Sequence, residues 1–272
     1  MGVYDGHSLY KCYVSFSFTL IMKIGLVFSG GGVRALAHAG LLKALEEKGL
    51  RPSIISGTSG GALIGGLYAC GIAPDDMLSF FKETPVFKWS MLTFKKVGLV
   101  DSAKYTKFFQ KQFKCTTFEQ LQLPLVVTAT NLLNGKVEYF SKGELIQPLI
   151  ASSALPPYFS PVKIGDNLYC DGGLLNNFPI EPLKDQCDTI IGSFVNPLEI
   201  ITEKELTNSF QFMQRIYNIT MDGNYNRKFK KCNHLLLHNL SNVGVLDTHR
   251  LDHAFEYGYE MAINYFANSL IC

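Results

Sequence analysis

Gly57-Thr58-Ser59-Gly60-Gly61 matches the G-x-S-x-G pattern, in which a serine lies on a sharp turn between a strand and a helix. The flanking glycines leave room for the turn, so the hydroxyl is clear of the sheet. A helix after Ser59 would also point the positive end of its dipole at an anion forming there. The pattern therefore predicts Ser59 as a nucleophile. A glycine-rich turn that serves only close helix packing is the alternative.

A serine nucleophile also needs hydrogen-bond donors for the oxyanion that forms when it attacks a carbonyl. Successive glycines at the start of a helix free their backbone N–H groups, and each such donor lowers the barrier by about 2.7–4 kcal/mol. We expect the oxyanion site to be formed by Gly30, Gly31, Gly32, Arg34 and Gly60, with Arg34 supplying a positive charge.

The same glycines fit a second motif. Gly30-x-Gly32-x-x-Ala35 matches the G-x-G-x-x-[GA] pattern of dinucleotide-binding loops. That motif requires an acidic residue at the end of the next strand, about 20 residues on. Ile55-Ser56-Gly57 stands there instead, which favours the oxyanion loop over a nucleotide loop.

Asp171 is the candidate base. It follows an expected strand and precedes Gly172 and Gly173, so its carboxylate can project from the strand end without crowding. A carboxylate is a weaker base than imidazole, so the site would have to raise its pKa or compensate through positioning. The alternative for Asp-Gly-Gly is an Asx-type turn without chemistry.

Four histidines follow Asp171, so a Ser-Asp-His order is formally available: His234, His238, His249 and His253. None lies in a glycine-rich loop. The spacing of His249 and His253 would suit a metal on one helix face, but no third ligand is evident. We expect no metal and no cofactor.

These residues must be positioned by elements that alternate short β-branched runs with helical patterns, which is typical of βα units and a largely parallel sheet. Asn134-Gly135 predicts a two-residue hairpin loop. We expect strands over 23–28, 52–56, 123–130, 137–140, 162–164, 167–170, 189–195 and 234–238, and helices over 33–48, 59–71, 74–81, 101–113, 145–153, 203–221 and 247–266.

Composition excludes several classes of protein. The 272 residues are 47% hydrophobic and 18% charged, which is incompatible with disorder, and a net charge of +2 is too small for a nucleic-acid footprint. The seven cysteines form no Cys-x-x-Cys pair and indicate reduced thiols in the cytoplasm. Lys23 interrupts the most apolar stretch, so we expect no membrane-spanning helix.

Three segments together resemble the patatin-like phospholipase family, most of all its short single-domain bacterial members: Gly30-Gly31-Gly32-Val33-Arg34, Gly57-Thr58-Ser59-Gly60-Gly61 and Asp171-Gly172-Gly173-Leu174-Leu175-Asn176-Asn177. The likeness extends from about Lys23 to the final helix. One position departs, because Ala35 stands where the family loop often has glycine.

The resemblance implies a three-layer patatin-like α/β sandwich with a mostly parallel central sheet. It also implies hydrolysis of lipid carboxylic esters by a dyad of Ser59 and Asp171, without histidine, metal or cofactor. The alternatives are a Ser-Asp-His esterase or thioesterase and a catalytically silent lipid- or nucleotide-binding protein.

Two segments remain. We expect residues 1–21 to be a dispensable extension, with Met22 as the working initiator, and residues 22–272 to form one acyl hydrolase domain. Residues 85–100 interleave aromatic side chains with lysines, a composition that suits a lid or an interfacial face in peripheral contact with a membrane. An ordinary surface loop is the alternative. The expected partner is a lipid or acyl-ester substrate, not a nucleic acid.

Overall fold

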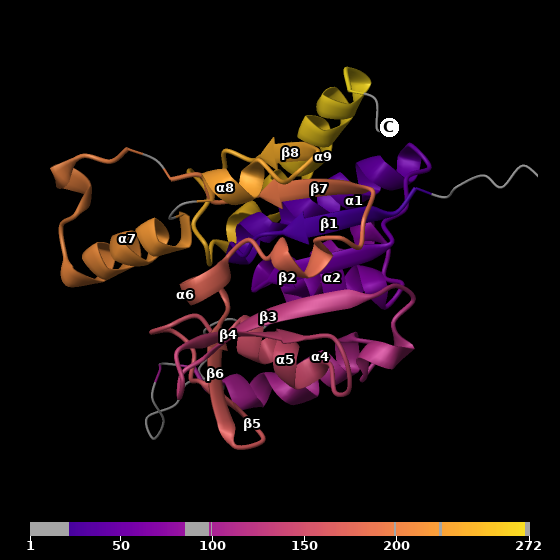
Figure 1. Ribbon diagram of the computed structural model, residues 1–272. Coiled ribbons are helices and arrows are strands. Elements are labelled where there is room, and N and C mark those ends of the chain that lie inside the picture. Colours follow the sequence, from indigo (N-terminus) through magenta and orange to yellow (C-terminus); the bar gives the residue numbers. More distant parts are fainter. Residues whose placement is uncertain (1–21, 85–97, 99, 199, 223–224, 270–272) are drawn as a thin grey trace, which may run out of the picture.

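A computed structural model of the protein describes residues 22–84, 98, 100–198, 200–222 and 225–269 (Figure 1). The extension over residues 1–21 and the aromatic, lysine-rich stretch over 85–97 lie outside the described residues. The predictions of a dispensable extension and of a lid therefore remain predictions.

One mixed sheet organises the described chain. β3, β2, β1, β7 and β8 pair in that order and are all parallel, whereas β4 and β6 are antiparallel to β3, and β5 is antiparallel to β6. This confirms the mostly parallel sheet. The strands are β1 (Ile24–Phe28), β2 (Ile54–Thr58), β3 (Leu125–Asn131), β4 (Lys136–Phe140), β5 (Val162–Ile164), β6 (Asn167–Asp171), β7 (Thr189–Phe194) and β8 (His234–Leu237).

The register along β3 brings two strand ends together. β4 pairs with residues 127–131, so it occupies one edge of β3. β2 pairs with residues 125–128 and β6 with residues 129–131, and both must share the other edge. β2 ends at Thr58, opposite Thr128, and β6 ends at Asp171, opposite Ala129. The residues that follow β2 therefore meet the end of β6 head to head.

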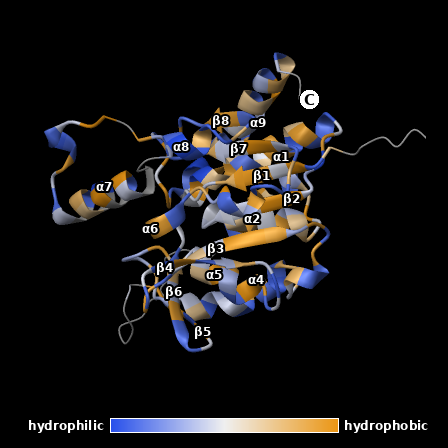
Figure 2. Ribbon diagram, viewed as in Figure 1, coloured by the Kyte–Doolittle hydropathy of each residue, from blue (hydrophilic) through white to orange (hydrophobic). Residues whose placement is uncertain are grey.

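Helices and apolar clusters cover both faces of the sheet, which confirms the three-layer α/β sandwich. Neighbouring strand residues point to opposite faces: Leu26 packs in the larger cluster with α1, α2, α5 and α9, whereas Val27 packs with Phe178 and Tyr225 in the smaller one. Figure 2 shows the hydrophobic strands between these layers. The helices are α1 (Leu36–Glu47), α2 (Gly60–Ala69), α3 (Met77–Glu83), α4 (Tyr105–Gln112), α5 (Ile146–Ser152), α6 (Gly173–Asn176), α7 (Ser209–Asp222), α8 (Asn226–Phe229) and α9 (Leu251–Ala267).

The prediction of a two-residue hairpin loop at Asn134-Gly135 is wrong, because the loop is longer. Asn131 pairs with Lys136, which leaves a four-residue loop between β3 and β4. The Asn131 carbonyl accepts a hydrogen bond from the Gly135 N–H at 2.9 Å, and its side-chain oxygen accepts one from the Leu133 N–H at 3.0 Å. The Asn131 side chain therefore closes the loop earlier than the Asn134-Gly135 signal indicated.

The expected helix over 203–221 begins later, at Ser209. A separate one-turn 3-10 helix (Glu203–Glu205) precedes it, closed by a reciprocal capping box between Thr202 and Glu205. The short helices α6 and α8 were not expected, because four residues are too few to show a helical period. Among the described residues, no helix combines the length and the apolar character needed to cross a bilayer.

Candidate active site

Ser59 lies on a strained turn between β2 and α2. Its φ of 53° and ψ of −126° fall in a region that residues with a side chain rarely adopt. The turn needs glycine at position 57, because a Cβ there would lie 2.8 Å from the backbone nitrogen of Ala62. This is the strand–turn–helix context that the G-x-S-x-G pattern predicted.

Ser152, at the end of α5, secures this turn. The Ser59 N–H donates to Ser152 Oγ at 2.8 Å, and the Ser152 hydroxyl donates to the Thr128 carbonyl at 2.6 Å. Ser152 is fully buried, so neither bond competes with water. Sequence reasoning missed Ser152, because no motif distinguishes one serine of a helix from another.

The structure brings Ser59 and Asp171 into direct contact. Ser59 Oγ donates to Asp171 Oδ2 at 2.6 Å, and the other carboxylate oxygen, Oδ1, accepts from the Gly173 N–H at 2.7 Å. Gly172 and Gly173 connect β6 to α6, so this backbone donor belongs to the Asp-Gly-Gly turn itself. Both carboxylate oxygens are held, and the proton of Ser59 already points at a base.

Burial sets the basicity of this carboxylate. Only 1% of Asp171 is exposed, and this desolvation raises the pKa of Asp171 to about 7, although the hydrogen bonds from Ser59 and Gly173 lower it. At neutral pH both protonation states are populated, which suits a group that must accept and then return a proton.

Gly31, Gly32 and Gly60 present backbone donors beside Ser59. All three line the same cavity as Ser59 and Asp171. Within the part of the chain that the structure describes, their N–H groups have no hydrogen-bond acceptor. They can therefore bind an oxyanion that forms on a carbonyl attacked by Ser59.

Gly30 and Arg34 are placed differently from these donors. The Gly30 N–H donates to the Asn177 carbonyl at 3.2 Å, so it is not available to an oxyanion. Arg34 donates through Nε to the Val243 carbonyl at 2.6 Å and through a terminal nitrogen to Asn196 Oδ1 at 3.1 Å. Asn196 in turn donates to the Gly30 carbonyl. Both predicted residues thus brace the glycine loop.

Gly32 explains why this loop needs glycine. Its φ is +55°, and a Cβ on it would lie 2.0 Å from the Val245 carbonyl oxygen. The next residue, Val33, donates its N–H to that same carbonyl at 2.9 Å. The loop is therefore pressed against the segment that precedes α9.

A buried pair of histidines braces the other side of the loop. His38 Nε2 lies 2.9 Å from the Ser29 carbonyl, which can only accept, so His38 Nδ1 accepts from the Ser193 hydroxyl at 2.7 Å. Ser193 Oγ then accepts from His238 Nε2 at 2.8 Å. Burial lowers the pKa of His38 to about 4 and that of His238 to about 3, so both rings are neutral at pH 7.

None of the four histidines considered for a triad lines the cavity. His238 belongs to the buried pair, and His234 contacts Tyr265 near the end of α9. His249 lies in the 3-10 turn before α9, and His253 lies in the first turn of α9. No group of three metal-ligating side chains occurs among the described residues. His38 was missed, because its position on an apolar helix resembles that of any core residue.

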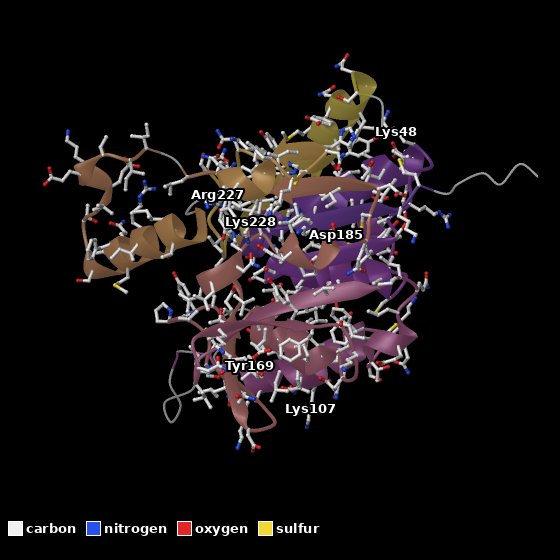
Figure 3. All side chains as sticks on the ribbon, viewed as in Figure 1. Lys48, Lys107, Tyr169, Asp185, Arg227 and Lys228 are labelled. Atoms are coloured by element: carbon white, nitrogen blue, oxygen red, sulfur yellow. The ribbon has the colours of Figure 1, made fainter. Side chains whose placement is uncertain are left out.

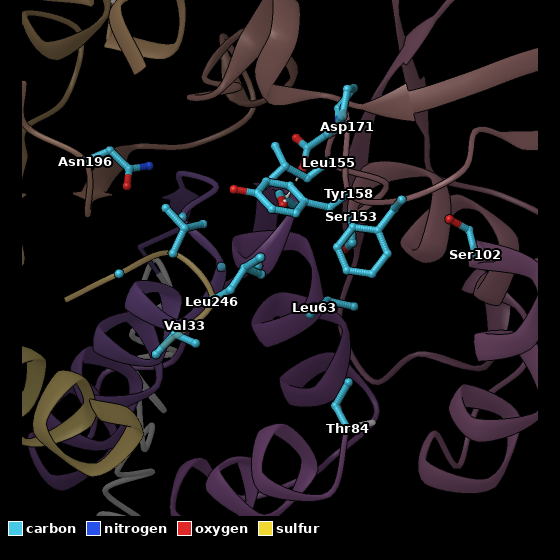
Figure 4. A pocket seen from close by; sticks show the side chains of 18 of the residues that line it. Val33, Leu63, Thr84, Ser102, Ser153, Leu155, Tyr158, Asp171, Asn196 and Leu246 are labelled. Atoms are coloured by element: carbon cyan, nitrogen blue, oxygen red, sulfur yellow. Dashed lines mark hydrogen bonds between the residues drawn. The ribbon is translucent and has the colours of Figure 1, made fainter. Parts of the chain in front are cut away.

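The cavity above Ser59 has a volume of about 980 Å³ and is lined mainly by apolar side chains. Figure 4 shows the Asp171 carboxylate pointing into it beside Leu155 and Tyr158. Such a lining suits an extended hydrocarbon chain. Apolar residues of the wall include Leu63, Phe80, Tyr105, Phe109, Ile150 and Phe159.

Comparisons with known proteins agree with this geometry. A family model described as patatin-like phospholipase matches residues 26–184. The lysophospholipase NTE1 of Cryptococcus neoformans var. neoformans serotype D is 33% identical over 172 residues, which are 60% of this chain and 10% of that protein. The lysophospholipase nte1 of Emericella nidulans is 29% identical over 205 residues, which are 72% of this chain and 13% of that protein.

Among solved structures, VipD from Legionella pneumophila has a similar fold. It matches with a TM-score of 0.57 at 16% identity, and the match covers 90% of this chain and 67% of that chain. The curated relatives are much longer, since this chain spans only about a tenth of their length.

Proposed function

Because this chain belongs to the patatin-like phospholipase family, we propose that it hydrolyses carboxylic esters of lipids, with Ser59 as nucleophile and Asp171 as base. The observation that carries the proposal is the 2.6 Å hydrogen bond from Ser59 Oγ to a carboxylate whose pKa is raised to about 7. The lysophospholipase names of two relatives support a phospholipid or lysophospholipid as the ester.

In the first step, Ser59 Oγ attacks the ester carbonyl carbon while its proton passes to Asp171 Oδ2. The tetrahedral oxyanion is bound by the N–H groups of Gly31, Gly32 and Gly60, which no other group among the described residues engages in a hydrogen bond. The intermediate then collapses, the C–O bond to the alcohol breaks, and Asp171 returns the proton to the leaving alkoxide.

In the second step, a water molecule takes the place of the alcohol. Asp171 accepts a proton from this water as its oxygen attacks the acyl-enzyme carbonyl, and the same three N–H groups bind the second oxyanion. Ser59 leaves with the proton from Asp171, and the free fatty acid is released. The dyad ends in its starting protonation state.

Covalent labelling with a fluorophosphonate tests the proposal, because only an activated serine reacts with this probe. We expect the wild-type chain to be labelled at Ser59 and to hydrolyse p-nitrophenyl acyl esters. Ser59→Ala should abolish labelling, and both Ser59→Ala and Asp171→Asn should lower kcat/KM by at least about a thousandfold.

The control is Ser141→Ala, which removes an exposed serine after β4 and should change neither labelling nor turnover. Labelling that persists in Ser59→Ala would refute the nucleophile. A loss as deep as that of Ser59→Ala in His234, His238, His249 or His253 variants would favour a triad. A wild-type chain that binds acyl chains but resists the probe would favour a catalytically silent lipid-binding protein.

A further inference from the structure

α7 exposes an apolar face at the edge of the molecule where the cavity opens. In Figure 1 it lies apart from the sheet, and the element it contacts most is α6. Four of its apolar side chains are 41–58% exposed, and their spacing places them on one face of the helix. We call these residues the α7 face: Phe212, Met213, Ile216 and Ile219.

The opposite face of α7 is polar. Gln211 and Arg215 are four residues apart and lie on the other side of the helix. Asn218 follows them by spacing but also lines the cavity. Figure 2 shows that hydrophobic and hydrophilic residues alternate along α7. A helix with one exposed apolar face and one polar face is typical of segments that lie in the plane of a membrane interface.

The α7 face is continuous with the cavity. Met213 and Ile216 line the cavity that contains Ser59, and so does Leu132 of the β3–β4 loop. Leu132 and Leu133 are themselves 41% and 64% exposed. The outer apolar surface and the cavity wall therefore share side chains. An acyl chain could pass from a lipid layer to Ser59 without crossing water, which favours a lipid surface over a protein partner.

The segment after α7 is basic. Arg227, Lys230 and Lys231 lie on or just after α8 and are exposed, and no ion-pair partner for them occurs among the described residues. Lys228 differs, because it pairs with Glu181 at 2.8 Å. Figure 3 labels Arg227 and Lys228 on this helix. Exposed lysine and arginine side chains next to an apolar face complement anionic lipid headgroups.

We propose that the α7 face, together with the basic residues of the α8 segment, docks onto an anionic phospholipid bilayer and delivers ester lipids from it to the cavity. This inference rests on the proposed function for the delivery of substrate, but the docking itself does not require catalysis. It assigns membrane contact to described residues outside the 85–100 stretch.

Sedimentation with vesicles tests the docking separately from the chemistry. The full chain carrying Ser59→Ala, which leaves the lipids intact, is mixed with vesicles of phosphatidylcholine alone or with added phosphatidylglycerol. We expect strong binding only to the anionic vesicles. Phe212→Ser with Ile219→Ser should reduce this binding at least about tenfold, because two apolar side chains no longer enter the interface.

Charge and position are tested by two further variants. Arg227→Gln with Lys231→Gln should weaken binding to anionic vesicles by roughly 25-fold, at roughly fivefold per charge. Leu237→Ser, which removes a 41% exposed apolar side chain from β8, is the matched control and should bind as the parent does. Circular dichroism checks that each variant is folded.

Soluble-ester turnover distinguishes the two proposals. This test uses the chain that retains Ser59. The double variant Phe212→Ser with Ile219→Ser should hydrolyse a short soluble ester at the rate of the wild type, because neither side chain lines the cavity. Docking is overturned if the parent does not sediment with anionic vesicles, or if the folded α7 variant binds them as well as the parent does. Binding without turnover would instead uphold docking and refute only the proposed function.

Discussion

Replacing Asp171 by Asn should make the protein more stable while removing its activity. The pKa of Asp171 is raised from 3.8 to about 7 by burial, so ionising this carboxyl in the folded state opposes folding. At a pH above 7 this rise in pKa corresponds to a loss of about 4 kcal/mol from the free energy of unfolding. Asn removes this penalty and can still accept from Gly173 and donate to Ser59 Oγ.

The expected difference in the free energy of unfolding between Asp171→Asn and the wild type depends on pH. A raised folded-state pKa means that the native protein holds the proton between pH 3.8 and 7 while the unfolded chain releases it. The contribution of Asp171 to the free energy of unfolding therefore falls as the pH rises through that window, and the variant lacks this fall. The advantage of Asp171→Asn should be near zero at pH 4 and reach roughly 2–4 kcal/mol at pH 8.

Urea unfolding of both proteins at pH 4, 6 and 8 measures this difference. Asp166→Asn, in the exposed turn between β5 and β6, is the matched control and should show no such trend. The reasoning is refuted if Asp171→Asn is destabilised at pH 8, or if its difference from the wild type is the same at all three pH values.

Three further predictions concern the residues that brace the site. Ser152→Ala removes the acceptor for the Ser59 N–H, so we expect kcat for a soluble ester to fall about 10- to 100-fold with little change in KM. Gly32→Ala places a Cβ against a backbone carbonyl at a positive φ, and we expect steady-state kinetics and thermal unfolding to show loss of both activity and stability. His38 and His238 have pKa values lowered to about 4 and about 3, so the unfolded chain binds more protons as the pH falls below 6.5. Their contribution, roughly 4 kcal/mol together by pH 5, should be lost on acidification, and His38→Gln should halve that slope in urea unfolding.

Much of the site could be predicted from local patterns. Three motifs each indicate a backbone conformation that only small residues allow: the G-x-S-x-G turn, the glycine loop and the Asp-Gly-Gly turn. All three line or border one cavity. The alternation of strands and helices likewise gave the mostly parallel sheet, because each element carries its own period. These signals are contained within a few neighbouring residues.

The rest depends on contacts between distant segments. Ser152, His38 and Ser193 act through hydrogen bonds to residues far away in the chain, and nothing in their own neighbourhoods indicates this. The same holds for Arg34, whose motif suggested a charge at the oxyanion but whose partners are Val243 and Asn196. Only the fold determines which groups are already engaged.

The geometry of the strand ends suggests why the proposed dyad needs no histidine. β2 and β6 meet along β3, so Ser59 Oγ and Asp171 Oδ2 are only 2.6 Å apart, and no imidazole can lie between them. A carboxylate in water would be too weak a base for this task, but burial raises the pKa of Asp171 into the range usual for histidine. Direct contact places the base next to Ser59, and burial gives that base a high enough pKa. A triad divides these two tasks between two residues. Here both follow from a strand that ends inside the protein.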